Sequence, residues 1–108
     1  MLNTVIACGF EPEQLEQLDQ ALRDDYVLRI EDCICNGVYS NAICCLIYEE
    51  GVEKENVHHM TALWSDMDSR YKAKTVWIGG YPPILAFEHY KDFNTALQNL
   101  NDILQEAN

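Results

Sequence analysis

The side chains in this sequence that could carry chemistry include five cysteines, three histidines and a pair of adjacent glutamates. Glu49-Glu50 follows the apolar run Ala42–Tyr48, Gly9 ends the run Thr4–Gly9, and Gly80-Tyr81 follows the run Thr75–Gly79. If these runs are parallel strands, their carboxyl ends meet at one edge of a sheet, where open α/β sheets bind ligands. The sequence therefore predicts a crevice at that edge, and its candidate ligand-binding residues are Gly9, Glu49, Glu50, Gly79, Gly80 and Tyr81.

Two other groups of residues suggest a metal site or a nucleophile, but neither suggestion is strong. Cys33-x-Cys35 with His58-His59 lacks the two-residue spacer of a zinc pair and has no second pair. Cys8 would lie at a strand end beside a helix N-terminus, where a thiolate is favoured. A buried structural role is the commoner fate of a cysteine within an apolar strand. We therefore expect no metal ion, no cofactor and no catalytic residue.

The elements that would position the crevice follow from hydrophobic patterning. The three apolar runs have no helical period, which is typical of strands covered on both faces. Tyr26–Ile30 alternates between apolar and other residues, so we expect a strand nearer the sheet edge. Helical spacing predicts one helix from Pro12 to about Arg23-Asp24-Asp25, and another whose apolar face holds Met60, Leu63, Trp64, Met67 and Tyr71.

Two segments have more than one interpretation. Glu31–Asn41 contains the turn signal Asn36-Gly37 and could be a hairpin, but we favour an irregular crossover with at most a short helix. The C-terminal part could be one long helix from Pro82. We favour a fifth strand, Ile84–Tyr90, followed by a last helix, Asp92–Glu106, because Asp92 and Asn94 are good N-cap residues in the middle of that stretch.

Together these elements predict a single α/β domain over residues 1–108. The expected fold is a flavodoxin-like three-layer sandwich, in which a mostly parallel sheet of four to five strands carries helices on both faces. The strand order would be 2-1-3-4-5. The link Gly80–Pro83 leaves no room for a helix between the fourth and fifth strands.

The stretch Ile84–Phe93, followed by Ala96, Leu97 and Leu100, resembles the end of a response-regulator receiver domain. In that family the last strand carries a lysine, and Lys91-Asp92-Phe93 is similar, with aspartate where proline is usual. The family's acidic pair would fall near Cys8-Gly9, its phosphoacceptor aspartate near Tyr48-Glu49-Glu50 and its hydroxyl residue near Gly79. Because a Mg²⁺ ion needs clustered carboxylates, the resemblance implies a receiver-like scaffold without the phosphotransfer reaction.

Cys8 also resembles the phosphocysteine of sugar-phosphotransferase B subunits in its position. In those proteins the following loop is rich in small and hydroxyl residues that hold phosphate. Here the loop is Gly9-Phe10-Glu11-Pro12-Glu13, which is acidic and has no hydroxyl group. The departure argues against a phosphocysteine.

Charge and cysteine content limit the kinds of partner and the location that we expect for this chain. Asp and Glu outnumber Lys and Arg by 18 to 7, which gives a net charge of −11 and a pI near 4.4. Such a surface repels phosphate backbones and anionic lipids, so we expect neither nucleic-acid nor membrane partners. No targeting segment is visible, and an odd number of cysteines, several of them on apolar strands, favours reduced thiols and a cytoplasmic location.

The function that fits these features is a non-catalytic regulatory or protein-interaction module. The alternative is a small ligand-binding or enzymatic domain that uses the predicted crevice. A missing helix near the last strand would leave Trp77, Phe87 and Tyr90 thinly covered. Exposed aromatics of this kind favour burial by a partner, and a symmetric homodimer through the fourth and fifth strands is the simplest one.

Overall fold

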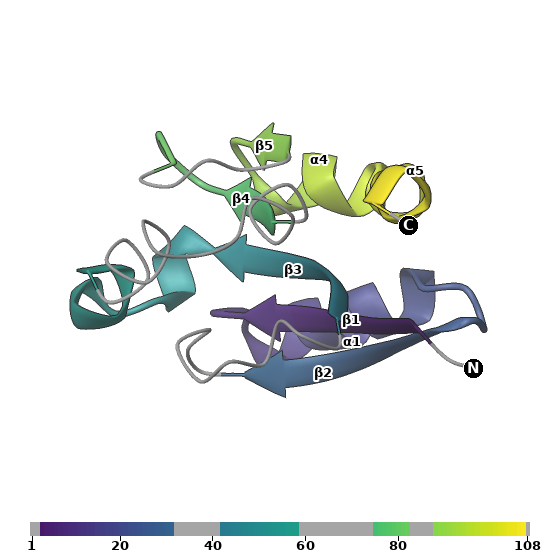
Figure 1. The fold of residues 1–108 in the computed structure, drawn as a ribbon. Helices are drawn as coiled ribbons and strands as arrows, with labels where there is room; N and C mark the ends of the chain where they lie inside the picture. Colours follow the sequence, from purple (N-terminus) through teal and green to yellow (C-terminus); the bar gives the residue numbers. More distant parts are fainter. Residues whose placement is uncertain (1–2, 32–41, 59–74, 83–87, 108) are drawn as a thin grey trace.

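The fold is a five-stranded parallel sheet, seen in a computed structural model that describes residues 3–31, 42–58, 75–82 and 88–107 (Figure 1). The spatial order is β2-β1-β3-β4-β5, and every neighbouring pair is parallel. The strands are β1 (Asn3–Cys8), β2 (Tyr26–Glu31), β3 (Ala42–Tyr48), β4 (Thr75–Ile78) and β5 (Glu88–Tyr90). The predicted flavodoxin-like α/β fold and its strand order are confirmed, whereas helices on both faces of the sheet stay a prediction.

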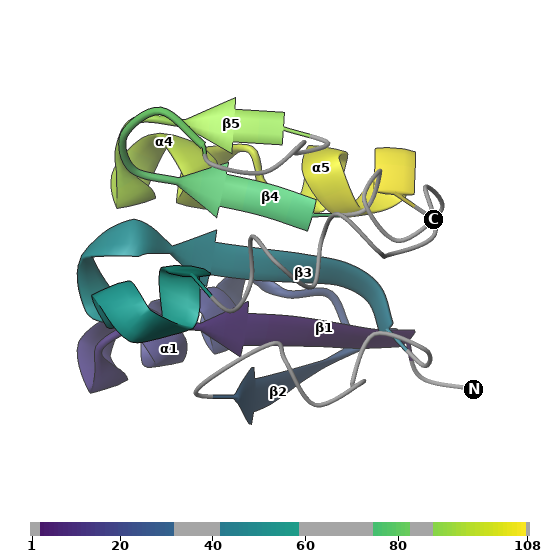
Figure 2. The same cartoon turned by 60° about the vertical axis from the view of Figure 1, so that its left-hand side comes forward.

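One face of the sheet packs against three helices, α1 (Pro12–Ala21), α4 (Phe93–Gln98) and α5 (Leu100–Ala107). Figure 2 shows α1 behind β1, and α4 and α5 behind β4 and β5. Successive side chains of a strand point to opposite faces, and the sheet residues of this cluster alternate accordingly. The buried core on this face consists of Val5, Ala7, Cys44, Leu46, Val76 and Ile78 from the strands and Leu18, Phe93, Ala96, Leu100, Ile103 and Leu104 from the helices.

The opposite face of the sheet is buried as well. Six of its side chains on β1, β3 and β4 are no more than 1% exposed, and they are Ile6, Cys8, Cys45, Ile47, Thr75 and Trp77. Burial on both faces is what the uninterrupted apolar runs predicted. The helix predicted around Met60–Tyr71 lies outside the described residues, as does the crossover at 32–41.

The N-terminal ends of the helices follow ordinary capping rules. Pro12 occupies the first turn of α1, where its missing N–H costs nothing. The helix ends at Ala21, with Leu22 as its C-cap, slightly earlier than predicted. Asp92 caps α4, since its Oδ1 accepts a hydrogen bond from the Thr95 backbone amide at 2.8 Å. That cap confirms a new helix beginning at this point.

The C-terminal part combines a confirmed prediction with a correction. Residues Glu88–Tyr90 form a strand parallel to β4. The predicted fifth strand is therefore confirmed over these residues, and the alternative of a single long helix from Pro82 is wrong. Residues 83–87 lie outside the described residues. The predicted last helix, Asp92–Glu106, is wrong as one unit because it breaks at Asn99. The Asn99 side chain donates to the Thr95 carbonyl at 2.8 Å, and such local polar bonds compete with a helix's own ladder.

Trp77 corrects the premise of the predicted dimer interface. Its side chain is 0% exposed, so it is covered within the chain. Tyr90 is half-buried, and Phe87 lies outside the described residues. The expectation that large aromatics stay uncovered beside β4 is therefore wrong for Trp77, and the homodimer loses that support. None of the described helices is long and apolar enough to cross a membrane.

Candidate functional site

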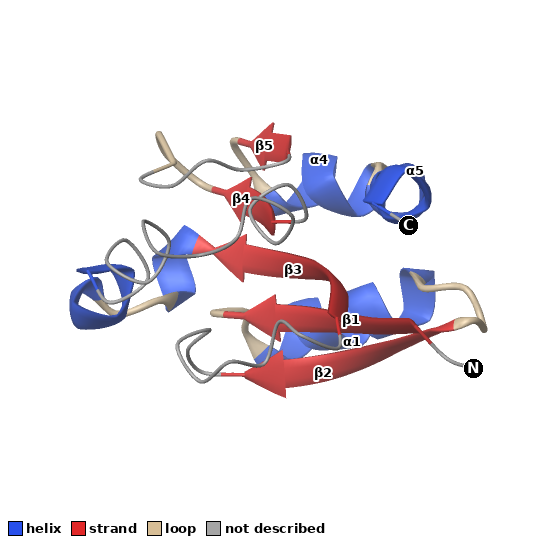
Figure 3. Ribbon diagram, viewed as in Figure 1, coloured by secondary structure: helices blue, strands red, loops and turns tan. Residues whose placement is uncertain are grey.

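The candidate site is the edge of the sheet where the strands end. Gly9 directly follows β1, β3 runs into the short 3-10 helix η3 (Glu49–Gly51), and β4 is followed by the turn Gly79-Gly80-Tyr81. Figure 3 shows η3 and the helical residues 54–58 beyond the tip of β3. Loops at this edge of a parallel sheet are the usual place for ligand-binding groups.

Five of the six predicted residues line one hollow at this edge, which we call the β4 hollow. Its volume is about 490 Å³, and the predicted residues in it are Glu49, Glu50, Gly79, Gly80 and Tyr81. His89 and Lys91 complete the wall. A hollow of this size falls within the range of small-molecule pockets.

A hydrogen-bonded turn forms the floor of the β4 hollow. Glu49 Oε2 accepts a hydrogen bond from the Gly80 backbone amide at 3.0 Å, which ties the end of β3 to the turn after β4. The Gly79 amide donates to the Tyr90 carbonyl at 2.8 Å. Gly79 has φ +145°, and a Cβ there would lie 2.6 Å from Glu49 Cβ, so this position requires glycine.

His89 and Lys91 were missed as site residues by the sequence argument. His89 Nε2 lies 3.1 Å from the Gly79 carbonyl oxygen, which adds a third contact to the turn. Lys91 directly follows β5, so the rule that placed Glu49 and Gly79 at the sheet edge, applied to the fifth strand, would have found it. Its ammonium group supplies a positive charge to a hollow that also holds two carboxylates.

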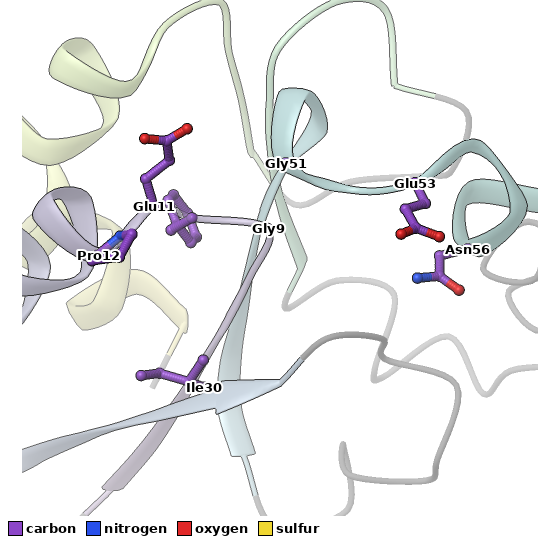
Figure 4. A pocket seen from close by; sticks show the side chains of 8 residues that line it. Gly9, Glu11, Pro12, Ile30, Gly51, Glu53 and Asn56 are labelled. Carbon is purple, nitrogen blue, oxygen red and sulfur yellow. The ribbon is translucent and has the colours of Figure 1, made fainter.

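Gly9, the sixth predicted residue, does not line the β4 hollow. It lines a groove of about 730 Å³ at the point where the strand order reverses, between β1 and β3 (Figure 4). We call this the switch-point groove. Its lining comprises Gly9, Phe10, Glu11, Pro12, Ile30, Gly51, Glu53 and Asn56. None of the last seven was predicted as a site residue.

Backbone contact explains why Gly9 is separated from the β4 hollow. A Cβ built on Gly51 would overlap the Gly9 carbonyl group, and a Cβ on Gly9 would lie 2.5 Å from the Tyr48 carbonyl oxygen. Gly9 also has φ +90°, a conformation that glycine adopts at little cost. The two loops therefore touch through their main chains.

Three aromatic rings fill the adjoining space on the side of α4. Phe10 stacks on Tyr48 with ring centroids 5.4 Å apart, and it meets the edge of Phe93 at 5.8 Å. The Tyr48 hydroxyl donates to Glu50 Oε2 at 2.9 Å. A side-chain hydrogen bond with Gln14 lowers the pKa of Tyr48. The net effect is nevertheless a raised pKa, because the hydrogen bond to Glu50, burial, and the negative charges of Glu50 and Glu11 together outweigh it. Tyr48 thus keeps its proton and orders Glu50.

The N-terminus of α1 decides which ligands the switch-point groove can accept. A helix N-terminus at this position would ordinarily attract phosphate. Here Glu11 and Gln14 form a capping box: the Glu11 side chain accepts from the backbone at Gln14, and Gln14 Oε1 accepts from the Glu11 amide at 2.9 Å. The chain's own carboxylate therefore occupies the place of an anion.

The other candidate groups lie apart from one another or inside the sheet. In the part of the chain that the structure describes, no three His, Cys, Asp or Glu side chains gather as metal ligands. Cys8, Cys44 and Cys45 are buried in the strands, with at most 1% exposure. His58 lines a third hollow of about 470 Å³, which Glu49 and Glu50 also line. Cys33, Cys35 and His59 lie outside the described residues.

No protein-family model and no curated protein matches this chain.

Proposed function

We propose that this chain is a non-catalytic regulatory or protein-interaction module that uses the carboxyl edge of a receiver-like sheet. One observation carries the proposal: Glu11 caps α1 at the switch point, so the phosphate-binding position of this architecture holds a carboxylate of the chain itself. A phosphorylated substrate or cofactor would meet like charge there.

The residues at the receiver-like positions support the same conclusion. Cys8-Gly9 stands where an acidic pair would be needed, and Cys8 is fully buried. Glu49 stands near the acceptor position, and its carboxylate already holds the Gly80 amide. Lys91, which matches the family's lysine in the resemblance, lines the β4 hollow together with Glu49. Among the residues that the structure describes, no carboxylates gather there in the way that Mg²⁺ would need.

A partner would find an anchor on the β4 turn. Tyr81 is 93% exposed, and it follows a turn that is held by Glu49 and by the carbonyl of Tyr90. Tyrosine is enriched among the residues that dominate binding energy, and a preorganised loop loses little entropy on binding. Sedimentation at micromolar concentration decides whether the partner is a second copy of this chain.

The direct test is incubation with acetyl phosphate and Mg²⁺, followed by intact-mass measurement and thermal shift with ATP and with a flavin nucleotide. We expect no added phosphoryl mass and no change in melting temperature. Glu11→Gln is the informative variant, because it removes the blocking charge and keeps most of the cap. A phosphoryl adduct on Glu49 or Glu50, or a saturable nucleotide shift in the wild type, would contradict the proposal.

A second candidate function is binding of a small ligand in the β4 hollow, and its volume of about 490 Å³ is the observation that favours it. A lysine and two glutamates in the lining of one hollow would suit a small zwitterion. Amide spectra of the wild type and of Lys91→Ala, recorded with a mixture of free amino acids, distinguish the two functions. Saturable movement of the Gly80 signal, lost in the variant, would favour the ligand site.

A further inference from the structure

The outer edge of β2 combines unpaired backbone groups with exposed apolar side chains. We propose that β2 pairs antiparallel with β2 of a second copy of this chain, with Leu28 on the two-fold axis, so that two sheets join into one. This proposal rests on the proposed function, because it names the partner of an interaction module. The interface lies at the opposite edge of the sheet from the one that the sequence predicted.

The two edges of the sheet differ in how open they are to another strand. β5 is three residues long, whereas β2 has six residues that stay in register with β1 without a shift. Figure 1 shows β2 as the outermost strand, and among the described residues it pairs with β1 alone. Short edge strands, proline and lysine protect an edge from pairing. β2 has none of these protections, so it is the edge that a further strand can join.

The hydrogen bonds to β1 fix which backbone groups of β2 point outward. Asn3 is the register partner of Tyr26, and its amide donates to the Asp25 carbonyl at 2.9 Å. In a parallel ladder a residue bonds to the residues before and after its partner, so alternate residues of β2 serve β1. The backbone groups of Tyr26, Leu28 and Ile30 therefore point to the free edge. The Tyr26 amide is already bonded to the Arg23 carbonyl, which leaves its carbonyl for a partner.

The side chains of this edge are apolar on both faces of the sheet. Ile30 is 61% exposed and Val27 is 42% exposed, and they are two of the three large exposed hydrophobic residues in the described part of the chain. Tyr26 and Leu28 pack against the core on the helix side, and Ile30 shares their face by strand alternation, while Val27 lies on the other. A partner strand would cover apolar surface on both faces at once.

Placing the axis at Leu28 satisfies the outward groups and covers both exposed side chains. The two Leu28 residues exchange their amide and carbonyl bonds, and each Ile30 amide reaches the Tyr26 carbonyl of the other copy. Ile30 then lies opposite Tyr26 of the second copy, which is a favourable pairing of a β-branched and an aromatic side chain. Val27 lies opposite Arg29, whose methylene stem can cover it.

Charge complementarity supports the same register. Arg29 Nε lies 2.7 Å from Glu31 Oε1, and a guanidinium has further N–H donors. With the axis at Leu28, Asp25 of the second copy lies diagonally across from Arg29, within reach of a long side chain. An axis at Arg29 would place two arginines opposite each other. An axis at Ile30 would pair only Arg29–Glu31 of β2, instead of Tyr26–Ile30, and would leave Val27 uncovered by β2.

The local charge also favours a second copy at this edge. The segment from Arg23 to Glu31 carries two arginines and three acidic side chains, whereas acidic residues outnumber basic ones by 18 to 7 in the whole chain. Two copies that meet here bring together the less acidic part of each. An interface of one strand pair is small, so we expect a dissociation constant in the micromolar range.

The first test measures association and register on the unmodified chain. Sedimentation velocity from micromolar to NMR concentration should show a reversible monomer–dimer equilibrium. A filtered NOE experiment on a mixture of isotope-labelled and unlabelled chains should show contacts from the Ile30 methyl groups to the Tyr26 ring of the other copy. These two side chains lie four residues apart in one extended strand, so only pairing between copies brings them into contact.

Charge exchange tests the register by a second route. Arg29→Glu and Asp25→Arg should each weaken the dimer about tenfold, because each turns two attractive pairs of the dimer into repulsive ones. Mixing the two variants should restore the affinity to within about threefold of the wild type, because residues 29 and 25 then attract across the interface. Asp19→Arg is the matched control: it makes the same charge change at an exposed position of α1, and it should not restore association with Arg29→Glu.

Three results would overturn the proposed dimer: a monomer at NMR concentration, a dimer without the contact between Ile30 and Tyr26, or equal restoration by Asp25→Arg and Asp19→Arg. Each of them would leave an interaction through Tyr81 intact. Failure of the proposed function has a different signature, namely nucleotide binding or a phosphoryl adduct in the wild type.

Discussion

Replacing Gly51 with alanine should destabilise the chain strongly, because the main chains of two loops touch at this residue. An added Cβ would overlap the carbonyl group of Gly9, which is backbone and cannot rotate away. The loops after β1 and β3 would have to separate, although β1 and β3 are adjacent central strands. Forced overpacking of this kind costs about 3 kcal/mol, the upper part of its usual range.

The size of the effect makes it easy to measure. For a domain of this length, about 3 kcal/mol corresponds to a fall in melting temperature of about 12 °C or more. With a urea dependence of about 1.5 kcal/mol per molar, the unfolding midpoint should fall by about 2 M. Circular dichroism during urea and thermal unfolding provides both values.

Gly80→Ala is the matched control for Gly51→Ala. The nearest atom to a Cβ on Gly80 is Glu49 Oε2 at 3.2 Å, the far end of a side chain that can move by a few tenths of an ångström. We expect a change within about 1 kcal/mol of the wild type, since the lost freedom of the unfolded chain offsets part of any cost. If Gly51→Ala proves as stable as Gly80→Ala, the close contact between the two loops is refuted.

Three further predictions concern capping, thiols and a tyrosine. Hydrogen bonds from the Thr95 backbone amide, and then from the Thr95 hydroxyl, lower the pKa of Asp92. The ionised Asp92 carboxylate therefore stabilises the fold at a pH above its ordinary pKa, and this stabilisation is lost as the pH falls through its pKa in the folded protein. Asp92→Ala should lower the urea midpoint at neutral pH, and a gap to the wild type that does not shrink in acid would contradict the cap. Cys8, Cys44 and Cys45 should resist a thiol reagent until denaturant is added, since they are at most 1% exposed, and rapid labelling of any of them in the folded protein would be inconsistent with this burial. Burial, and then the negative charges of Glu88, Glu106 and Asp102, raise the pKa of Tyr90. The protonated Tyr90 hydroxyl therefore contributes its full stability at a pH below its ordinary pKa, and this stability is lost as the pH rises through its pKa in the folded protein. Tyr90→Phe should flatten the loss of stability above about pH 10, and an unchanged alkaline profile would count against this assignment.

The sequence by itself determined the strands and the order in which they pair. Uninterrupted apolar runs at Thr4–Gly9, Ala42–Tyr48 and Thr75–Gly79 can only be buried on both faces, and short connections in a parallel sheet restrict the topology to few choices. The N-cap at Asp92 could also be predicted from the sequence, because capping depends on neighbours three residues away. The helix break at Asn99 could not be predicted in this way, since it depends on a single hydrogen bond from the Asn99 side chain to the Thr95 carbonyl.

The tertiary structure alone decided how the candidate site is divided. The sequence placed Gly9, Glu49 and Gly79 at one edge, but it contains no information on the distance between loops. The contact between the Gly9 and Gly51 main chains separates the switch-point groove from the β4 hollow. The register of β5 brings Lys91 and His89 to the hollow that Glu49 lines, and Ile30 of β2 joins the lining of the switch-point groove. Such meetings depend on long-range packing, whereas local pattern fixes only the direction in which each strand ends.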